Sequence, residues 1–390
     1  MLYVCINYIS MNRIEKLLSI SILLTIMIPS NAQFKNPRNL EFTWKTDTTK
    51  YGVDLSEITL VLPKGTFPKI DYPSFLNKND GLNAFYLHEP VISVEIGGKA
   101  KAYPLNMLTT HEISNDKIGD VPILATYCPL CNASVVYDRR VNINGKEKVL
   151  EFEVSGMLRK SDMVMLDTGT ETLWQQFMGE AIVGEYTGTL LEVIPSLVIS
   201  VEEFFQRYPE GIILSNSNSN ERLSSRYGTN PYVGYDKKGS NPYDRFFNTE
   251  DVDKRLPAME RVIDIEVNGE YKIYPFSKIS AEGVVNDRFK NFNLVFFHSE
   301  RTVSVLDASK ISASKSIGSV TVFNPTLDGQ LLTFKKGDEY FVDDISGSRW
   351  DITGRCIEGR MKGSQLAIVP HSNHFAFAWL AFFPDSEIFE

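Results

Sequence analysis

Residues 91–116, with the sequence VISVEIGGKAKAYPLNMLTTHEISND, decide the fold because the chain repeats them further on. Residues 262–287, VIDIEVNGEYKIYPFSKISAEGVVND, align with them at a constant offset of 171 and match at nine of 26 positions. Further matches follow at an offset of 175, where Gly179, Gly184, Gly188, Leu191 and Pro195 meet Gly354, Gly359, Gly363, Leu366 and Pro370. A fixed period of this kind indicates a repeated structural unit. The sequence therefore predicts two duplicated units related by pseudo-symmetry, residues 91–213 and 262–390, with the second copy matching to residue 388.

Each predicted unit consists mainly of β-strands. Apolar and polar residues alternate on both sides of Gly97-Gly98 in the first copy and of Asn268-Gly269 in the second, which is typical of hairpins. Each copy should close with a short helix. Residues 201–208 form the first, with Ser200 as its N-cap, and the apolar residues 375–383 form a buried second one. The predicted class is α+β, dominated by β-structure.

Two segments lie outside the units. Residues 33–90 contain five prolines and are predicted to be a Pro-rich, extended lead-in. Residues 214–261 are rich in turn residues and are predicted to connect the two copies. The tyrosines of YGTNPYVGY, residues 227–235, indicate that this connecting segment packs against the rest of the protein.

The N-terminus has the pattern of a secretory signal peptide. Basic residues of MNRIEK are followed by the apolar run LLSISILLTIMI and by the small residues of SNA. We expect residues 1–32 to be removed, with Met11 as the start and Gln33 as the first mature residue. The protein should then be exported to the periplasm or beyond, with no stable membrane span after cleavage, because the apolar run is short for a span.

The net charge limits the class of partner. A formal charge of -9 argues against nucleic acid as the ligand. The partner remains open at this point, and is either a redox partner or a small substrate.

Cys128-Pro-Leu-Cys131 is the most specific chemical motif. Two thiols at this spacing form a disulfide, bind a soft metal or do redox chemistry. The motif follows a predicted strand and precedes a hairpin, which disfavours a thioredoxin fold. Outside the cytoplasm an inert structural disulfide is the plain alternative. Cys356 is left over and is predicted to be a small buried residue.

Three histidines are candidate partners of these thiols. His371 and His374 precede the last helix and, if they share a helical face, would complete a two-sulfur, two-nitrogen set for zinc or copper. Because the cysteines belong to one copy and this histidine pair to the other, such a site would lie at the junction of the copies. The alternative is that one histidine caps the helix and the other packs beside Trp379. His111 is the third candidate, as a catalytic base or merely as a hydrogen-bonded core residue.

Long motifs in this sequence resemble a bacterial family known as domain of unknown function 3179. They are AYPLNML with TTHEISND, TYCPLCNASVVYDRR, VSGMLRKSDMVMLD, LWQQFMGEAIVG, RYPEGIILS, YGTNPYVGY and PHSNHFAFAWLAFFP. Some members of that family are selenoproteins with selenocysteine in the Cys-x-x-Cys motif. The resemblance therefore implies redox chemistry at Cys128 and Cys131, although it implies no established activity.

Three hypotheses follow. The first is an exported thiol oxidoreductase in which Cys128 and Cys131, assisted by His111 or a metal, react as a redox pair. The second is a non-enzymatic zinc or copper protein that binds through Cys128, Cys131, His371 and His374. The third is a structural binding module with an inert disulfide.

Overall fold

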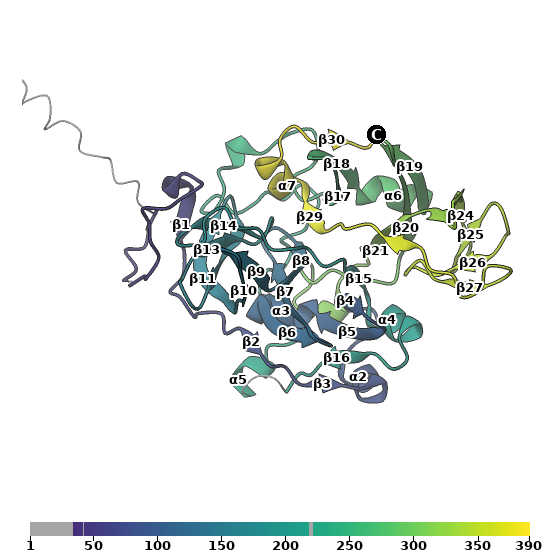
Figure 1. Ribbon diagram of the computed structural model, residues 1–390, viewed down its shortest axis with the longest axis horizontal. Coiled ribbons are helices and arrows are strands. Elements are labelled where there is room, and N and C mark those ends of the chain that lie inside the picture. Colours follow the sequence, from purple (N-terminus) through teal and green to yellow (C-terminus); the bar gives the residue numbers. More distant parts are fainter. Residues whose placement is uncertain (1–33, 42, 218–220) are drawn as a thin grey trace, which may run out of the picture.

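The computed structural model describes residues 34–41, 43–217 and 221–390. The described chain is β-rich, with several small sheets and short helices, as the β-dominated α+β prediction requires (Figure 1). The predicted signal peptide, residues 1–32, lies outside the described residues. Of the described helices, none is both long enough and apolar enough to cross a bilayer.

The first half of the chain contains three main sheets and a two-stranded ribbon. One sheet has the order β15-β4-β5-β16-β3, formed by β15 (Leu197–Ser200), β4 (Pro90–Ile96), β5 (Lys99–Pro104), β16 (Ile212–Leu214) and β3 (Phe75–Leu76). A second has the order β2-β6-β7-β8, formed by β2 (Ile70–Asp71), β6 (Ile113–Ile118), β7 (Val121–Cys128) and β8 (Ala133–Asp138). The third has the order β1-β11-β12-β13-β14, formed by β1 (Ile58–Leu60), β11 (Phe152–Arg159), β12 (Asp162–Asp167), β13 (Leu173–Gln175) and β14 (Glu180–Val183). The ribbon pairs β9 (Arg140–Ile143) with β10 (Lys146–Val149).

The second half is built from smaller sheets of the same kind. Its first sheet has the order β29-β17-β18-β30, formed by β29 (Asn373–Phe375), β17 (Arg261–Val267), β18 (Glu270–Pro275) and β30 (Glu387–Ile388). The next has the order β19-β20-β21-β28, formed by β19 (Val284–Phe289), β20 (Phe292–Ser299), β21 (Ser319–Asn324) and β28 (Ala367–Ile368). The remaining strands are β22 (Thr326–Leu327), β23 (Gln330–Leu331), β24 (Phe334–Lys336), β25 (Phe341–Asp343), β26 (Arg349–Trp350) and β27 (Cys356–Glu358).

The helices are short, and most of them pack against strands. They are α2 (Lys78–Ala84), α3 (Leu105–His111), α4 (Val201–Arg207), α5 (Glu221–Ser224), α6 (Phe276–Glu282) and α7 (Ala376–Phe382), with 3₁₀ turns η1 (Leu55–Glu57), η2 (Thr249–Asp251) and η3 (Ile311–Ala313). The N-cap prediction is confirmed, since Ser200 forms a capping box with Glu203. The apolar helix α7 is buried over residues 376–380, as its composition predicts.

Several side-chain contacts recur in the two halves. The Tyr103 hydroxyl donates to Asp116 at 2.6 Å, and the Tyr274 hydroxyl donates to Asp287 at 2.7 Å. The same aspartates pair with lysines, Lys101 with Asp116 and Lys272 with Asp287. Asn115 bonds the backbone of Phe152, and Asn286 bonds that of Phe334. The indole of Trp174 donates to Asp167, and that of Trp350 donates to Asp343. The edge strands match as well. β15 and β29 run antiparallel to β4 and β17, whereas β16 and β30 run parallel to β5 and β18.

The lead-in and the connection are parts of the folded body. Residues 33–90, predicted to be extended, supply β1, β2, β3 and α2 to the sheets. The connecting segment packs against the core, as its aromatic residues predict, and Tyr235 is buried within it. The two halves meet where β29 lies beside β8, and the Phe375 N–H donates to the Cys131 carbonyl at 2.8 Å (Figure 1).

Candidate functional site

The two cysteines lie at the tip of the β7–β8 hairpin. Cys128 is the last residue of β7 and pairs with Ala133 at the start of β8, so Pro129 to Asn132 form the loop between them. Asn132 adopts a left-handed conformation, with φ of 52°, which closes this loop. The motif therefore caps a strand rather than a helix. Both thiols are buried, and all three cysteines of the described chain are free.

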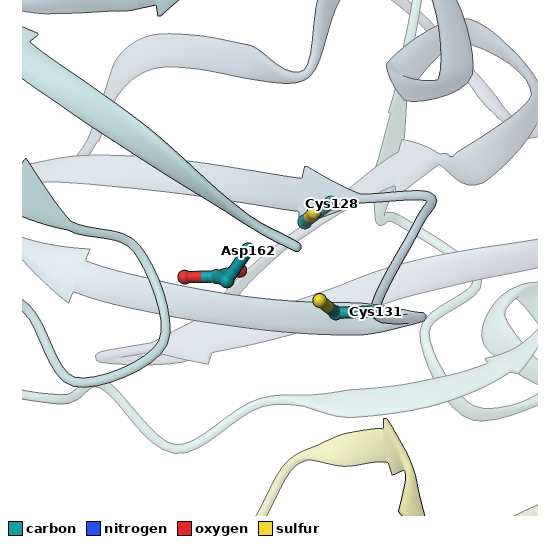
Figure 2. Close-up of side chains that lie close together, drawn as sticks. All are labelled: Cys128, Cys131 and Asp162. Carbon is teal, nitrogen blue, oxygen red and sulfur yellow. The ribbon is translucent and has the colours of Figure 1, made fainter. Parts of the chain in front are cut away.

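A second hairpin brings a carboxylate to the thiols. Lys160 and Ser161 join β11 to β12 with φ of 51° and 71°, the pattern of a tight type I′ turn, usually formed by Asn-Gly. Asp162 follows this turn directly. Its carboxylate and the two Sγ atoms lie within 4.8 Å of one another (Figure 2). In the part of the chain that the structure describes, this is the one grouping of three or more ligand-type side chains so close together.

The Asp162 carboxylate is fixed on one side and unsatisfied on the other. Its Oδ2 accepts hydrogen bonds from Gln175 Nε2 at 2.6 Å and from the Phe177 N–H at 3.0 Å. Its Oδ1 is buried without a well-formed hydrogen bond to any described residue. A buried oxygen in this state costs free energy unless something else binds it.

The groups around this oxygen are acidic, and their pKa values are all raised. Burial raises the pKa of Asp162 to about 7, with contact from the Cys128 thiol among the smaller opposing effects. Burial and the charge of Asp162 raise the pKa of Glu112 to about 8. Burial also raises the pKa of the Cys128 thiol and, more strongly, that of Cys131. The neighbouring charges that add to these pKa increases are negative ones, such as that of Asp162. The site therefore favours either protonated groups or a bound cation.

Glu112 is held in a conformation that favours glycine. It follows α3 with φ of 59°, and its carbonyl accepts a hydrogen bond from the N–H of Tyr127, next to Cys128. Gly283 occupies the matching place after α6, with φ of 72°, and its carbonyl accepts from the N–H of His298. Backbone strain at a buried acid beside reactive groups is typical of functional sites.

Tyrosines cover the cysteine loop. The Tyr127 hydroxyl donates to Asn132 Oδ1 at 3.3 Å, and the Tyr235 hydroxyl donates to the Leu130 carbonyl at 3.1 Å. Tyr235 also packs edge-on against Phe375, with ring centroids 6.0 Å apart. The connecting segment and β29 thus close the site from two sides.

His111, a predicted base, is engaged away from the sulfur atoms. Its Nδ1 lies 2.5 Å from the Pro68 carbonyl and its Nε2 lies 2.6 Å from the Tyr227 hydroxyl. Burial lowers its pKa, which favours the neutral ring. His111 is the last residue of α3, and Glu112 follows it directly. Of these two residues, Glu112 is the one whose charge raises the pKa of Cys128.

His371 and His374 lie in the segment that reaches the junction of the two halves, but their hydrogen bonds are to residues other than the two cysteines. His374 lies in strand β29 and not on the predicted helical turn, so His371 and His374 do not share a helical face. His374 Nε2 contacts Asp264 Oδ1 at 3.1 Å, and His371 Nδ1 contacts the Val369 carbonyl at 2.6 Å. The His374 ring packs against Phe177, with ring centroids 4.2 Å apart and planes tilted by 35°, and the Phe177 N–H donates to Asp162. The structure therefore gathers Cys128 and Cys131 with Asp162, which the sequence reading missed.

Asp162 carries a signal that sequence reasoning can use. It stands in the run SDMVMLD, residues 161–167, where Ser161 and Asp162 precede an apolar stretch. Asp162 begins β12, in which every residue is buried, and a carboxyl group in such a strand needs a polar partner. What the run does not reveal is that this hairpin tip meets the cysteine loop, since no local pattern encodes that contact.

These features define a β-rich protein with a buried thiol–carboxylate cluster at the tips of two hairpins. The chain belongs to the family described as "Protein of unknown function (DUF3179)", whose model matches residues 64–386. This confirms the resemblance noted from the motifs. No curated protein and no solved structure matches the chain.

Proposed function

We propose that the protein is an exported metal-binding thiol protein in which Cys128, Cys131 and Asp162 bind zinc or copper. One observation carries this proposal: two thiols and a carboxylate converge within 4.8 Å, and one carboxylate oxygen is buried without a partner. Sulfur and oxygen ligands at such separations suit a metal bound at ~2.0–2.3 Å from each ligand.

The electrostatics of the site also favour a bound metal ion. Bringing several acidic groups together in a buried site raises their pKa values, and a divalent cation would reverse that cost by replacing the protons. The ligand set lacks the two histidines of the sequence hypothesis. Three protein ligands would leave one of the four tetrahedral zinc positions for a small ligand, as in catalytic zinc sites.

The test is metal analysis of purified protein combined with free-thiol titration. We expect about one equivalent of zinc or copper. Asp162→Asn should weaken binding at least tenfold in a chelator competition, and Cys128→Ser should abolish it. Cys356→Ser is the matched control and should retain the metal. Metal-free protein with a stable Cys128–Cys131 disulfide would instead identify an inert structural module.

A dithiol redox function is the second candidate, and a specific asymmetry favours it. Hydrogen bonding between the thiols opposes the burial-induced rise in the pKa of Cys128 and adds to the rise for Cys131. Cys128 would attack a small organic disulfide, while Asp162 accepts its proton and one thiolate leaves. Asp162 would pass that proton to the leaving thiolate and then accept the proton of Cys131, whose sulfur attacks the Cys128 sulfur and releases the second thiolate, which takes up this proton. The two cysteines lose two electrons as the Cys128–Cys131 disulfide forms, and the small disulfide gains them as it is reduced to two thiols. Turnover of a small disulfide by metal-free protein, lost in Cys131→Ser, tests this candidate.

We also propose that residues 91–213 and 262–388 are diverged copies of one unit. The recurring tyrosine–aspartate and tryptophan–aspartate contacts support this duplication. Export is proposed on the N-terminal pattern, and N-terminal sequencing of protein from cells tests it. A mature chain that starts near Gln33 is expected, and an intact Met1 or Met11 would contradict cleavage.

A further inference from the structure

A cavity of about 730 Å³ is lined by residues of strands β5 and β6 and of the β9–β10 ribbon. This volume is in the range of small-molecule sites. The lining carries five basic and three acidic side chains, although the whole chain has a net charge of -9. The rest of the lining is mostly apolar and includes Tyr72, Pro122 and Val149. A local excess of positive charge in an acidic protein favours an anionic ligand.

Arg139 is the buried charge of this cavity. It directly follows β8 and lines the cavity, yet only 7% of its surface is exposed. Its guanidinium donates to the carbonyl oxygens of Ile123, Leu150 and Asp116 at 3.0, 2.7 and 3.1 Å. These three bonds leave two of the five N–H donors for a ligand. No carboxylate of the described chain forms an ion pair with Arg139, and a buried charge without a counter-ion is costly.

The nearby carboxylates are engaged elsewhere, whereas two lysines are not. Asp71 and Asp116 act on the charge of Arg139, but each is paired with a lysine, at 2.9 and 2.7 Å. Lys99 and Lys117 line the cavity and are exposed, and neither forms an ion pair with another described residue. Two accessible ammonium groups are therefore available to an anion in the same cavity as the buried guanidinium.

Tyr72 adds an aromatic ring to these cations. Its side chain is 83% exposed, and its backbone has a φ of 49°, a left-handed conformation that is uncommon for a bulky residue. The Tyr72 hydroxyl donates to Glu151 Oε1 at 2.9 Å, which holds the side chain in place. A ring this exposed contributes little burial energy to offset the backbone strain. A ligand that covers the ring would explain why the strained conformation is kept.

We propose that this cavity binds a small aromatic carboxylate. Its carboxylate group would accept hydrogen bonds from Lys99, Lys117 and Arg139, and would supply the counter-ion that the guanidinium lacks. Its ring would stack on Tyr72 and contact Val149. An inorganic anion would use the same charges but would leave this apolar side uncovered. The inference does not depend on the thiol site, because no residue of the thiol–carboxylate cluster lines this cavity.

The test follows benzoate by ligand-observed NMR on the full mature chain, with benzyl alcohol as the neutral counterpart and inorganic phosphate as a competitor. A ligand this small should bind with a Kd on the order of 1 mM. Lys99→Gln combined with Lys117→Gln should weaken benzoate binding roughly tenfold. Arg139→Gln should abolish it, and the lysine variant still decides the matter if Arg139→Gln fails to fold.

Tyr72→Gly separates a ligand-binding role from a structural one. Glycine adopts the left-handed conformation freely, so this variant should keep the urea midpoint of the native protein while its benzoate binding weakens severalfold. A tyrosine that served only the fold would show the reverse, a lower midpoint with unchanged binding.

Lys278→Gln combined with Lys362→Gln is the matched control. It removes two exposed lysine charges from outside the cavity and should bind benzoate as the native protein does. Equal binding of benzyl alcohol, full displacement of benzoate by an equal concentration of phosphate, or the absence of benzoate binding to the native protein would each overturn the proposal. Unchanged binding in the Lys99 and Lys117 double variant or in Tyr72→Gly would overturn it as well.

Discussion

Cys128 and Asp162 come from the tips of two different hairpins, and yet the sulfur and the carboxylate lie within 4.8 Å. The Ser161 carbonyl lies 3.9 Å from Cys128 Sγ, so the turn itself touches the thiol. Each tip is rigid because its strands are buried on both sides of the loop. Two rigid hairpins that meet in this way can hold reactive groups at fixed separations without a helix N-terminus.

The metal-free protein should be less stable at pH 8 than at pH 5. The folded-state pKa values of Asp162 and Glu112, about 7 and about 8, lie above their ordinary values of 3.8 and 4.5. The stability they contribute is fully present below about pH 4 and is lost as the pH rises toward 8. Urea unfolding of chelator-treated protein at both pH values measures this difference.

Asp162→Asn should reduce that pH dependence, since the amide does not titrate, while the buried Glu112 carboxyl still does. Asp338→Asn, which changes an exposed carboxylate of the second half, is the control and should leave the slope as it is. A native protein that is most stable at pH 8 without metal would show that these carboxylates are compensated by a charge other than a metal.

Cys128 should react with iodoacetamide before Cys131 in metal-free protein. Alkylation requires the thiolate, and the pKa of Cys131 is raised more than that of Cys128. Both should react at least tenfold more slowly than in urea, because both are buried. Partial labelling in a Cys356→Ser background, followed by peptide mass spectrometry, gives the order. Faster labelling of Cys131 would contradict the asymmetry on which the redox candidate depends.

The hairpins, the N-cap at Ser200 and the buried last helix could be predicted because their signals are local. Gly97-Gly98 and Asn144-Gly145 mark turns, and the left-handed φ values at these positions match that reading. The thiol cluster could not be predicted in full, since Asp162 reaches Cys128 only through the packing of separate sheets. The histidine pair misled for the same reason: its spacing suggested a helix, whereas β17 draws His374 into a strand.

Tyr103→Phe and Tyr274→Phe should destabilise the protein by similar amounts. Each hydroxyl donates to an aspartate that also pairs with a lysine, namely Asp116 and Asp287. Losing a hydrogen bond to a charged acceptor costs about 1.5–3 kcal/mol. Chemical unfolding curves of both variants provide the comparison. A large effect at one position and none at the other would count against equivalent roles in two copies.

Glu112→Gly should stabilise the protein although it removes a buried side chain. A non-glycine residue in the left-handed region costs roughly 1–2 kcal/mol, and the buried carboxyl adds to this cost at pH 8. The backbone contacts remain available to glycine, because Gly283 makes the same two after α6: its N–H donates to the Ile279 carbonyl, and its carbonyl accepts from His298. We therefore expect a gain of about 1–2 kcal/mol in the free energy of unfolding, read from urea midpoints.

Gly283→Ala is the reciprocal variant and should lose stability, since its Cβ would sit at φ of 72° and lie 2.9 Å from Lys336 Cγ. The charge of Glu112 acts on Cys128. If Glu112→Gly is more stable than the native protein but its metal binding or its Cys128 reactivity differs, the strained backbone at Glu112 serves the thiol site. If Glu112→Gly is instead less stable than the native protein, the carboxyl group has a structural partner and the strain has no functional explanation.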